Sequence, residues 1–100
     1  MIHIVQLIYL HEGREKEFLE FEDHVLPMLK QFHGVLELRL RPSQSAWIEG
    51  TRECPYEIHW VSFPGDQELR DYINSPERLK WLDLKEKSVR VSIQIKGDLV

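Results

Sequence analysis

Hydrophobic residues recur along this chain with two different periods, which predict strands and helices in alternation. Residues 2–10 are apolar on both alternating faces, as expected for a central strand that is covered on both sides. Residues 35–41 and 89–96 alternate between apolar and polar side chains, which predicts two strands with one apolar face each. Residues 56–63 are rich in aromatic and β-branched side chains and predict a further strand that ends at Pro64.

Two other regions have the spacing of amphipathic helices. Residues 14–32 carry apolar side chains every three or four positions, and we expect Gly34 to end this helix in the left-handed conformation. Pro27 lies inside the helix and predicts a kink, because an interior proline costs about 3 kcal/mol and removes a backbone hydrogen bond. A second helical region begins at Asp66 and restarts after Ser75, a serine cap followed by a proline.

The predicted order, strand-helix-strand-strand-helix-strand, is the pattern of one ferredoxin-like α+β domain over residues 1–100. We expect a four-stranded antiparallel sheet with both helical regions on one face. The first strand is apolar on both sides, so the uncovered face predicts a homodimer in which two sheets meet. The polar residues of the second and fourth strands are expected at the margin of that uncovered face, and they are Glu37, Arg39, Arg41, Arg90 and Gln94.

The chain also resembles a known superfamily, the dimeric α+β barrels. The resemblance lies in EFLEFEDHVLPML at residues 17–29 followed by HG at 33–34, and in SFP at 62–64 followed by YINSPE at 72–77. This superfamily includes antibiotic-biosynthesis-type monooxygenases, muconolactone-isomerase-like proteins and small proteins of unassigned function. The resemblance therefore implies a dimeric barrel and, where there is activity, cofactor-independent oxygenase or isomerase chemistry.

Composition and charge narrow the class of protein. The chain has 100 residues, of which 42% are hydrophobic and 30% charged, as in ordinary globular domains. Its formal net charge is -4, and the basic residues are scattered between acidic ones, so we expect no nucleic acid partner. No apolar run approaches the roughly 20 residues that cross a bilayer, so no membrane partner is expected. The apolar residues 2–10 lack the basic lead of a signal peptide and are interpreted as a strand.

Several kinds of chemistry lack their sequence patterns. The single cysteine, Cys54, has no second thiol and no activating motif, which argues against nucleophilic catalysis and fits the cytoplasm. No glycine-rich phosphate loop is present, so we expect no nucleotide cofactor. The histidines show no metal-ligand spacing, so we expect no metal; they are His3, His11, His24, His33 and His59.

Glu22 is the most informative polar residue of the first helix. On a helical wheel it falls inside the apolar stripe. Removing an unpaired carboxylate from water at such a position costs roughly several kcal/mol. One interpretation is a carboxyl group with a raised pKa that acts as general acid or base in a cavity between helix and sheet. The other is a Glu22 that leans to the margin of the stripe and pairs with a basic residue.

Two further polar residues are candidates beside Glu22. His24 lies at the opposite margin of the stripe, and it is either a surface partner of Glu20 or an acid or base at the edge of a pocket. Gln6 interrupts the even face of the first strand. It either orients a ligand or is a satisfied interior amide.

Aromatic residues offer flat surfaces for a planar ligand. We expect Trp60, on a strand, and Tyr72, on the helix that covers it, to line a pocket together. Trp47 lies in the long connection of residues 42–55, which suits either a lid or a dimer clasp. The charges of Glu37, Arg39 and Arg41 resemble a clamp for a ligand carboxylate, but an ion-pair network across the subunit interface is favoured.

Two functions follow from these residues. The first is a cofactor-independent monooxygenase or isomerase acting on a small aromatic or unsaturated molecule, with Glu22 and His24 as acid and base and with Gln6, Trp60, Tyr72 and Trp47 holding the substrate. The second is a non-catalytic dimer that binds a small ligand or a protein. A cavity above about 300 Å³ that contains Glu22 favours the enzyme, and a filled interface between helix and sheet favours the second function.

Overall fold

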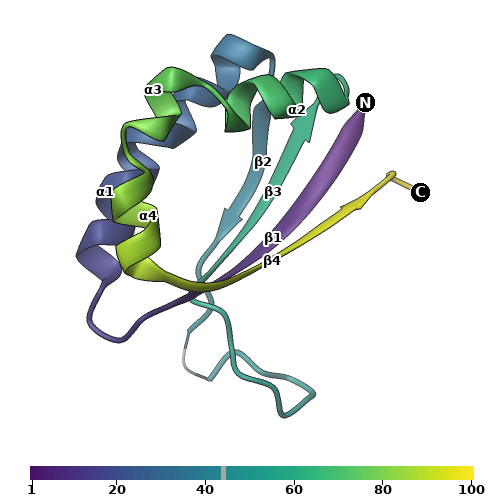
Figure 1. Ribbon diagram of the computed structural model, residues 1–100. Coiled ribbons are helices and arrows are strands. Elements are labelled where there is room, and N and C mark those ends of the chain that lie inside the picture. The colour runs from purple at the N-terminus through teal and green to yellow at the C-terminus, as the bar shows by residue number, and fades with distance from the viewer. Residues whose placement is uncertain (44) are drawn as a thin grey trace.

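One antiparallel sheet organises the chain (Figure 1), in a computed structural model that describes residues 1–43 and 45–100. Its four strands are β1 (Ile2–Leu10), β2 (Val35–Leu40), β3 (Glu57–Phe63) and β4 (Val89–Gly97), and they lie in the order β2-β3-β1-β4. The first and third strands are central and the second and fourth are at the edges. This is the ferredoxin-like α+β arrangement, so the predicted fold class is confirmed.

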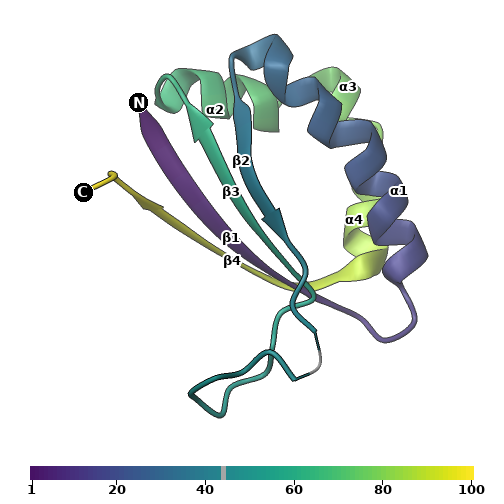
Figure 2. The same ribbon diagram turned by 180° about the vertical axis from the view of Figure 1, so that it is seen from behind.

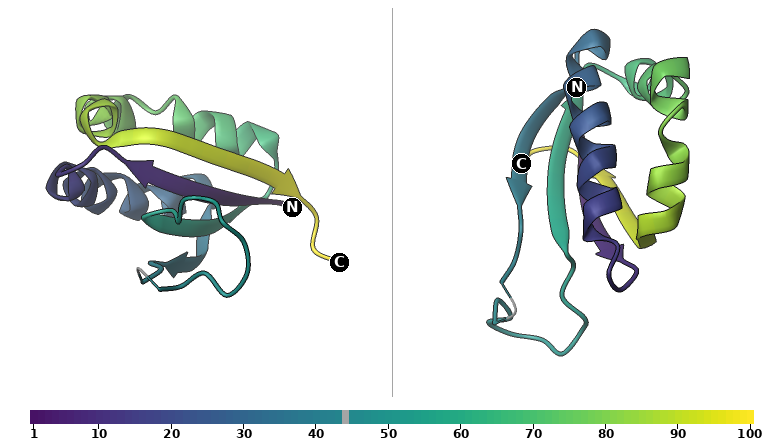
Figure 3. Two further views of the ribbon diagram at one scale, coloured as in Figure 1. Left: turned by 90° about the horizontal axis from the view of Figure 1, so that it is seen from below. Right: turned by 90° about the vertical axis from the view of Figure 1, so that its left-hand side faces the viewer.

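The helices all lie on one side of the sheet, as Figure 3 shows from two directions. They are α1 (Glu15–Val25), the 3₁₀ helix η1 (Leu26–Phe32), α2 (Asp66–Ile73), α3 (Pro76–Leu79) and α4 (Leu82–Ser88). We call the side of the sheet that they cover the covered face and the other side the open face. Figure 2 shows the molecule from behind, with α1, α3 and α4 to the right of the sheet. Within the described residues, no helix is both long and apolar enough to cross a membrane.

The hydrophobic core fills the space between the helices and the covered face. Ile4 and Phe63 from the sheet pack there with Leu29 and Tyr72 from the helices. The hydroxyl group of Tyr72 donates a hydrogen bond to the backbone oxygen of Val25 at 3.1 Å. This bond joins α2 to the end of α1, so the two helical regions are fixed relative to each other.

The first helical region is divided at its proline. A single kinked helix over residues 14–32 was expected, but α1 ends at Val25 and a 3₁₀ helix continues to Phe32. Pro27 stands in the first turn of this 3₁₀ helix, where its missing N–H group needs no helical partner. The change of helix type therefore replaces the kink.

The end of this region also differs from expectation. His33, with a φ of 60°, takes the left-handed conformation that was assigned to Gly34. Gly34 is required for a different reason, which is close packing. A Cβ atom at this position would lie 2.7 Å from Cε1 of Phe63 and 3.2 Å from Cδ2 of Leu29. The glycine therefore lets the chain enter β2 directly against the core.

A β-bulge at Glu37 changes the faces of β2. Leu36 pairs with Val61, but Leu38 pairs with Trp60, so the strand contains one extra residue between them. Cross-strand partners share a face of the sheet. Leu36 therefore packs against the core, whereas Leu38 and Leu40 lie on the open face, and the expectation that all three leucines share one face is wrong.

The open face is apolar at its centre and charged at its margin, where Glu37 accepts a hydrogen bond from Ser62 and Arg90 lies over the ring of Tyr9. The apolar residues of β4 pair with those of β1, Ile93 with Leu7 and Ile95 with Val5, and all of them face away from the helices. Gln94, expected at the open margin, instead pairs with Gln6 on the covered face. Large hydrophobic side chains on the open face are about half exposed in the single chain, and they are Val5, Val35, Leu38, Leu40, Val91, Ile93 and Ile95.

The connection between β2 and β3 extends beyond the end of the sheet, below it in Figures 1 and 2. Trp47 is 46% exposed there and covers Gly50, whose ideal Cβ position is 3.6 Å from the indole ring. Glu53 accepts a hydrogen bond of 2.6 Å from Arg90, which ties the connection to β4. The role of Trp47 as a lid or dimer clasp stays a prediction.

We predict that Gly34→Ala lowers the free energy of unfolding by about 1 to 3 kcal/mol, because the added methyl group must displace the Phe63 ring. Urea unfolding followed by circular dichroism measures the loss. Gly97→Ala is the matched control, since a Cβ atom at Gly97 meets no atom within 4 Å. Equal stability of the two variants would contradict the close packing at Gly34.

Candidate functional site

A cavity of about 80 Å³ lies between the helices and the covered face. Its walls are largely apolar, with Phe18, Phe21 and Val25 from α1 and Ile4 and Ile8 from β1 among them. Polar side chains also reach it, and they are Gln6, Glu22, His59, Tyr72, Arg78, Lys85 and Gln94. The cavity contains Glu22, but its volume is below the roughly 300 Å³ that the enzyme hypothesis set, so that size criterion is not met and only a smaller molecule would fit.

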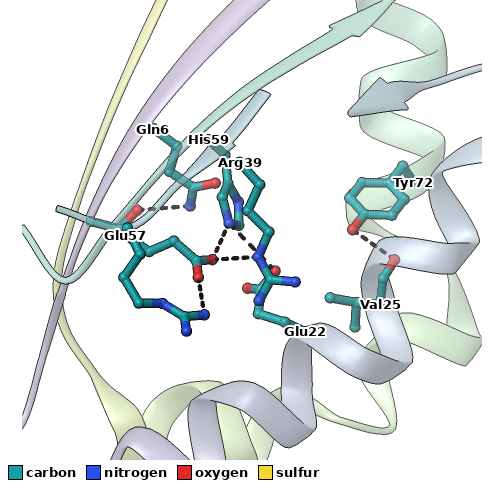
Figure 4. A network of polar contacts seen from close by, with 9 residues as sticks. Gln6, Glu22, Val25, Arg39, Glu57, His59 and Tyr72 are labelled. Atoms are coloured by element: carbon teal, nitrogen blue, oxygen red, sulfur yellow. Dashed lines mark hydrogen bonds and ion pairs between the residues drawn. The ribbon is translucent and has the colours of Figure 1, made fainter. Parts of the chain in front are cut away.

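Glu57 is the centre of a buried polar cluster beside this cavity, which Figure 4 shows from close by. Its side chain is fully buried. Arg39 donates from Nε to Oε2 at 3.0 Å and Arg41 donates from Nη2 to Oε1 at 2.7 Å, while His59 Nε2 is hydrogen-bonded to Oε2. Burial alone would raise the pKa of Glu57, but the hydrogen bonds from His59, Arg41 and Arg39 outweigh it and lower this pKa to about 2.

The β-bulge in β2 makes this cluster possible. Arg39 pairs with His59 across the strands, on the covered face. Without the extra residue at Glu37, the register set by Leu36 would place Arg39 opposite Ile58, on the open face. The bulge therefore turns Arg39 toward Glu57.

Glu22 lies on α1 opposite this cluster and points toward it (Figure 4). It is only 5% exposed, and its Oε2 atom has no hydrogen-bond partner in the described part of the chain. His59 Nε2 is 3.9 Å from that oxygen, which is too far for a hydrogen bond. Burial raises the pKa of Glu22 to about 7, and the negative charge of Glu57 adds to the effect while His59 opposes it.

Three of the residues proposed from the sequence come together in the cavity. Glu22, Gln6 and Tyr72 all line it, from α1, β1 and α2. The Gln6 amide donates a hydrogen bond to Ser92 Oγ at 3.0 Å, so one of its N–H groups is used within the fold. Burial raises the pKa of Tyr72, which keeps its hydroxyl group protonated as the donor to Val25.

The other three proposed residues lie elsewhere. His24 stacks on Trp81 of the segment before α4, with ring centroids 3.5 Å apart and planes within 3°, and it does not line the cavity. Trp60 lies on the open face, where its Nε1 donates to His3 at 3.1 Å, so the expected pocket of Trp60 with Tyr72 does not form. Trp47 is in the connection before β3, outside the cavity lining.

Sequence reasoning missed the central part of the site. Glu57 and His59 were not proposed, although at period two they share a face of β3 with Val61 and Phe63, and this shared apolar face is the signal that could have placed them inside. The expected ion-pair network across a subunit interface is also corrected, because Arg39 and Arg41 pair with Glu57 of the same chain. Glu37 instead accepts a hydrogen bond from Ser62 at 2.8 Å.

The cluster has a donor set that occurs in metal sites. Glu22, Glu57 and His59 each offer one ligand atom, and these atoms lie within 4.8 Å of one another. However, both carboxylate oxygens of Glu57 already accept hydrogen bonds from Arg39 and Arg41, whose positive charges would repel a cation. These arginine charges disfavour a metal ion at the cluster, and the expected absence of a metal stays a prediction.

Solved structures similar to this one share its fold. A protein of unknown function from Rhodopseudomonas palustris superimposes with a TM-score of 0.84 at 13% identity, over 99% of this chain and 82% of that one. The chain has a ferredoxin-like fold. A DABB family protein with this fold from Mesorhizobium loti gives a TM-score of 0.66 at 16% identity, with coverage of 99% and 96%.

A dimeric ferredoxin-like protein of unknown function from Bacteroides fragilis gives a TM-score of 0.71 at 8% identity, with coverage of 98% and 95%. NIPSNAP family proteins are among the further neighbours. No protein-family model and no curated protein matches the chain. The neighbours share the expected ferredoxin-like fold, and at these identities they show the fold alone.

We predict that Glu22→Gln stabilises the protein at neutral pH. A carboxyl group whose pKa rises from 4.5 to about 7 on folding opposes folding once pH exceeds 4.5, and the penalty stops growing near pH 7. The gain of the variant should therefore be nearly absent at pH 4 and reach on the order of 3 kcal/mol at pH 8. Urea unfolding at several pH values measures it.

Glu20→Gln, an exposed change on the same helix, is the control for this experiment and should show no such gain. A Glu22→Gln protein that is less stable than the wild type at pH 8 would contradict the buried, unpaired carboxyl group. That result would restore the second interpretation from the sequence, a Glu22 that is paired with a basic residue.

Proposed function

We propose that this protein is a cofactor-independent isomerase that moves a proton within a small unsaturated molecule, with Glu22 as the acid and base. The observation that carries the proposal is the buried Glu22 carboxyl group, whose Oε2 atom has no partner and which faces the cavity. A pKa near 7 lets the group both accept and return a proton at neutral pH.

The reaction requires two proton transfers. Ionised Glu22 removes a proton from a carbon next to a carbonyl group or double bond, and the electron pair moves into the conjugated system. Protonated Glu22 then returns the proton to a different carbon, so atoms and electrons balance without a second reactant. The Gln6 and Gln94 amides line the same cavity and can donate hydrogen bonds to the oxygen on which charge develops.

The buried cluster positions this acid and base. Glu57 fixes His59 by accepting its Nε2 hydrogen bond, and Arg39 and Arg41 keep Glu57 ionised. His59 then stands 3.9 Å from Glu22 without bonding to it. His59 is therefore a positioning residue in this proposal, because it limits how far the Glu22 carboxyl group can turn away from the cavity.

The geometry favours the isomerase over the monooxygenase among the reactions expected from the sequence. Proton removal and return need one carboxyl group, which Glu22 supplies, whereas oxygenation also needs a place for molecular oxygen beside the substrate. The cavity of about 80 Å³ also favours a short unsaturated molecule over an aromatic ring. We propose no cofactor for this chemistry, and Cys54 as the single cysteine supports a cytoplasmic location.

We predict that the protein exchanges carbon-bound hydrogen of small carbonyl compounds with solvent. Butanone and 2-oxobutanoate in D₂O, followed by proton NMR, should lose the signal of the hydrogens next to the carbonyl group faster with wild-type protein than with Glu22→Gln. Exposed Glu20→Gln is the control and should match the wild type. Equal exchange by the wild type and Glu22→Gln with every compound would contradict the proposal.

The second function, a non-catalytic ligand-binding dimer, is favoured by one observation on the open face. A hollow of about 350 Å³ is lined there by His3, Val5, Trp60 and Ile95, together with residues of the C-terminal segment. This volume is in the range of ligand pockets. The hollow shares no lining residue with the cavity that contains Glu22. Ligand binding at Trp60, without hydrogen exchange that depends on Glu22, would therefore fit this second function.

We also propose that a second copy of the chain covers the open face. The exposed hydrophobic side chains of β1, β2 and β4 share this face with Ile58 and Trp60 of β3, and water-soluble monomers rarely expose so large an apolar surface. An antiparallel sheet with one face on its core has room for a second sheet on the other. The described dimer from Bacteroides fragilis supports this assembly as a property of a similar fold.

We predict a mass of twice the 12.0 kDa chain in light scattering at micromolar concentration. Ile93→Lys, in the middle of the open face, should give monomer, because a lysine buried between two sheets would lose its hydration without a partner. Gln31→Lys, exposed on η1 at the helical side, should remain dimeric. A monomeric wild type, or a dimer unchanged by Ile93→Lys, would contradict the proposed interface.

A further inference from the structure

Two basic side chains line the cavity without an acidic partner. Arg78 comes from α3 and Lys85 from α4, and both lie in the wall that faces Glu22. Within residues 1–43 and 45–100, neither is in a salt bridge of 4.0 Å or less. By contrast, Lys80 and Lys96 have carboxylate partners at 2.9 and 3.1 Å. The positive charge at the cavity is therefore not neutralised by direct contacts.

Arg78 is held in place although its polar atoms are not all satisfied. Its guanidinium group lies over the rings of Tyr72 and Phe21, 5.1 and 5.7 Å from their centroids. One Nη1 hydrogen bond of 3.4 Å reaches the backbone oxygen of Ile73, and Nε is buried without a partner. A fixed guanidinium group with a free, buried N–H is a ready donor to an anion.

Lys85 adds a second cation to the same wall. Burial lowers the pKa of its ammonium group, the nearby Arg78 charge lowers it further, and Glu22 opposes the shift. The attraction of an anionic ligand beside Lys85 would offset both the cost of desolvation and the repulsion from Arg78. The arginines of β2 do not share this role, because Arg39 and Arg41 are already bonded to Glu57.

We propose that the cavity takes a small unsaturated monocarboxylate, whose carboxylate group binds Arg78 and Lys85 while its reacting carbon faces Glu22. The position of the reacting carbon at Glu22 rests on the proposed isomerase function, whereas the binding of the carboxylate group to Arg78 and Lys85 does not. Two cations against one carboxyl group leave a net positive charge in an apolar-walled cavity, so a single negative charge on the ligand balances it. The volume of about 80 Å³ limits the ligand to a few carbon atoms.

Binding of such an anion should depend on pH through Glu22. The charged and titratable groups that face Glu22 are His59 and Glu57 of β3, Arg39 of β2, Tyr72 of α2, Arg78 of α3 and Lys85 of α4. A protonated Glu22 does not repel the ligand carboxylate, whereas an ionised one does and also competes for the two cations. Binding should therefore weaken between pH 6 and pH 8 in the wild type.

Crotonate is the test ligand, and crotonamide is its uncharged analogue of the same shape. In NMR shift titrations at pH 6, Arg78→Met and Lys85→Met should each weaken crotonate binding at least about tenfold, because each removes a charge-assisted contact. Lys80→Met is the control, since exposed Lys80 does not line the cavity, and it should bind as the wild type does. Crotonamide should bind weakly and equally to all four proteins.

The Glu22→Gln variant separates this inference from the proposed function. It should bind crotonate with the wild-type affinity or better at pH 6 and should lose the weakening at pH 8. A second outcome is that crotonate binds through Arg78 and Lys85 while no hydrogen exchange depends on Glu22. That result would support the anion site and contradict the isomerase function.

Two results would overturn the anion site. One is a wild-type protein that does not bind crotonate, and the other is an equal affinity in Lys85→Met and Lys80→Met. If Arg78→Met fails to fold by circular dichroism, Arg78→Lys takes its place. The Arg78→Lys variant keeps the positive charge but loses the planar donor group. Its affinity for crotonate should therefore lie between that of the wild type and that of Lys85→Met.

Discussion

The buried carboxylate of Glu57 is the interaction on which the rest of the site depends. A carboxylate that is fully removed from water is stable only when charged donors surround it, and Arg39, Arg41 and His59 supply these donors. Breaking a fully buried ion pair typically costs about 3 to 5 kcal/mol, and removing Arg39 or Arg41 should cost less, because their side chains are 33% and 47% exposed. The fold therefore needs the two arginines on the covered face, and the β-bulge at Glu37 is the backbone feature that brings Arg39 there.

Glu57 and Glu22 show how one interior gives two carboxyl groups opposite properties. Glu57 receives the hydrogen bonds of its three donors, and its pKa falls to about 2. Glu22 lies a short distance away on α1, has no donor on Oε2, and its pKa rises to about 7. Because His59 is bonded to Glu57, it does not neutralise Glu22. Glu57 thus takes up all three donors, and within the described residues Glu22 Oε2 is left without a hydrogen-bond partner.

The sequence predicts the fold and part of the site, for reasons of periodicity. The strand and helix order follows from hydrophobic spacing, and Glu22 stands out because one polar residue interrupts a helical stripe. The bulge at Glu37 leaves no mark in the alternation of residues 35–41, so Arg39 was expected to face a partner subunit. The faces of Trp60 and Gln94 were missed for a similar reason, because alternation shows that two faces differ but not which one meets the helices.

The bulge also links the site to the proposed assembly. The same extra residue that turns Arg39 toward Glu57 turns Leu38 and Leu40 toward the open face, where they extend the apolar surface of β1 and β4. In a regular β2, a leucine would face the buried Glu57 and the arginines would face the second copy of the chain. A leucine at that position would leave the buried charge of Glu57 without donors. Arginines on the open face would bury like charges against each other between the two sheets. One inserted residue in an edge strand therefore satisfies the interior charge and makes the outer face apolar at the same time.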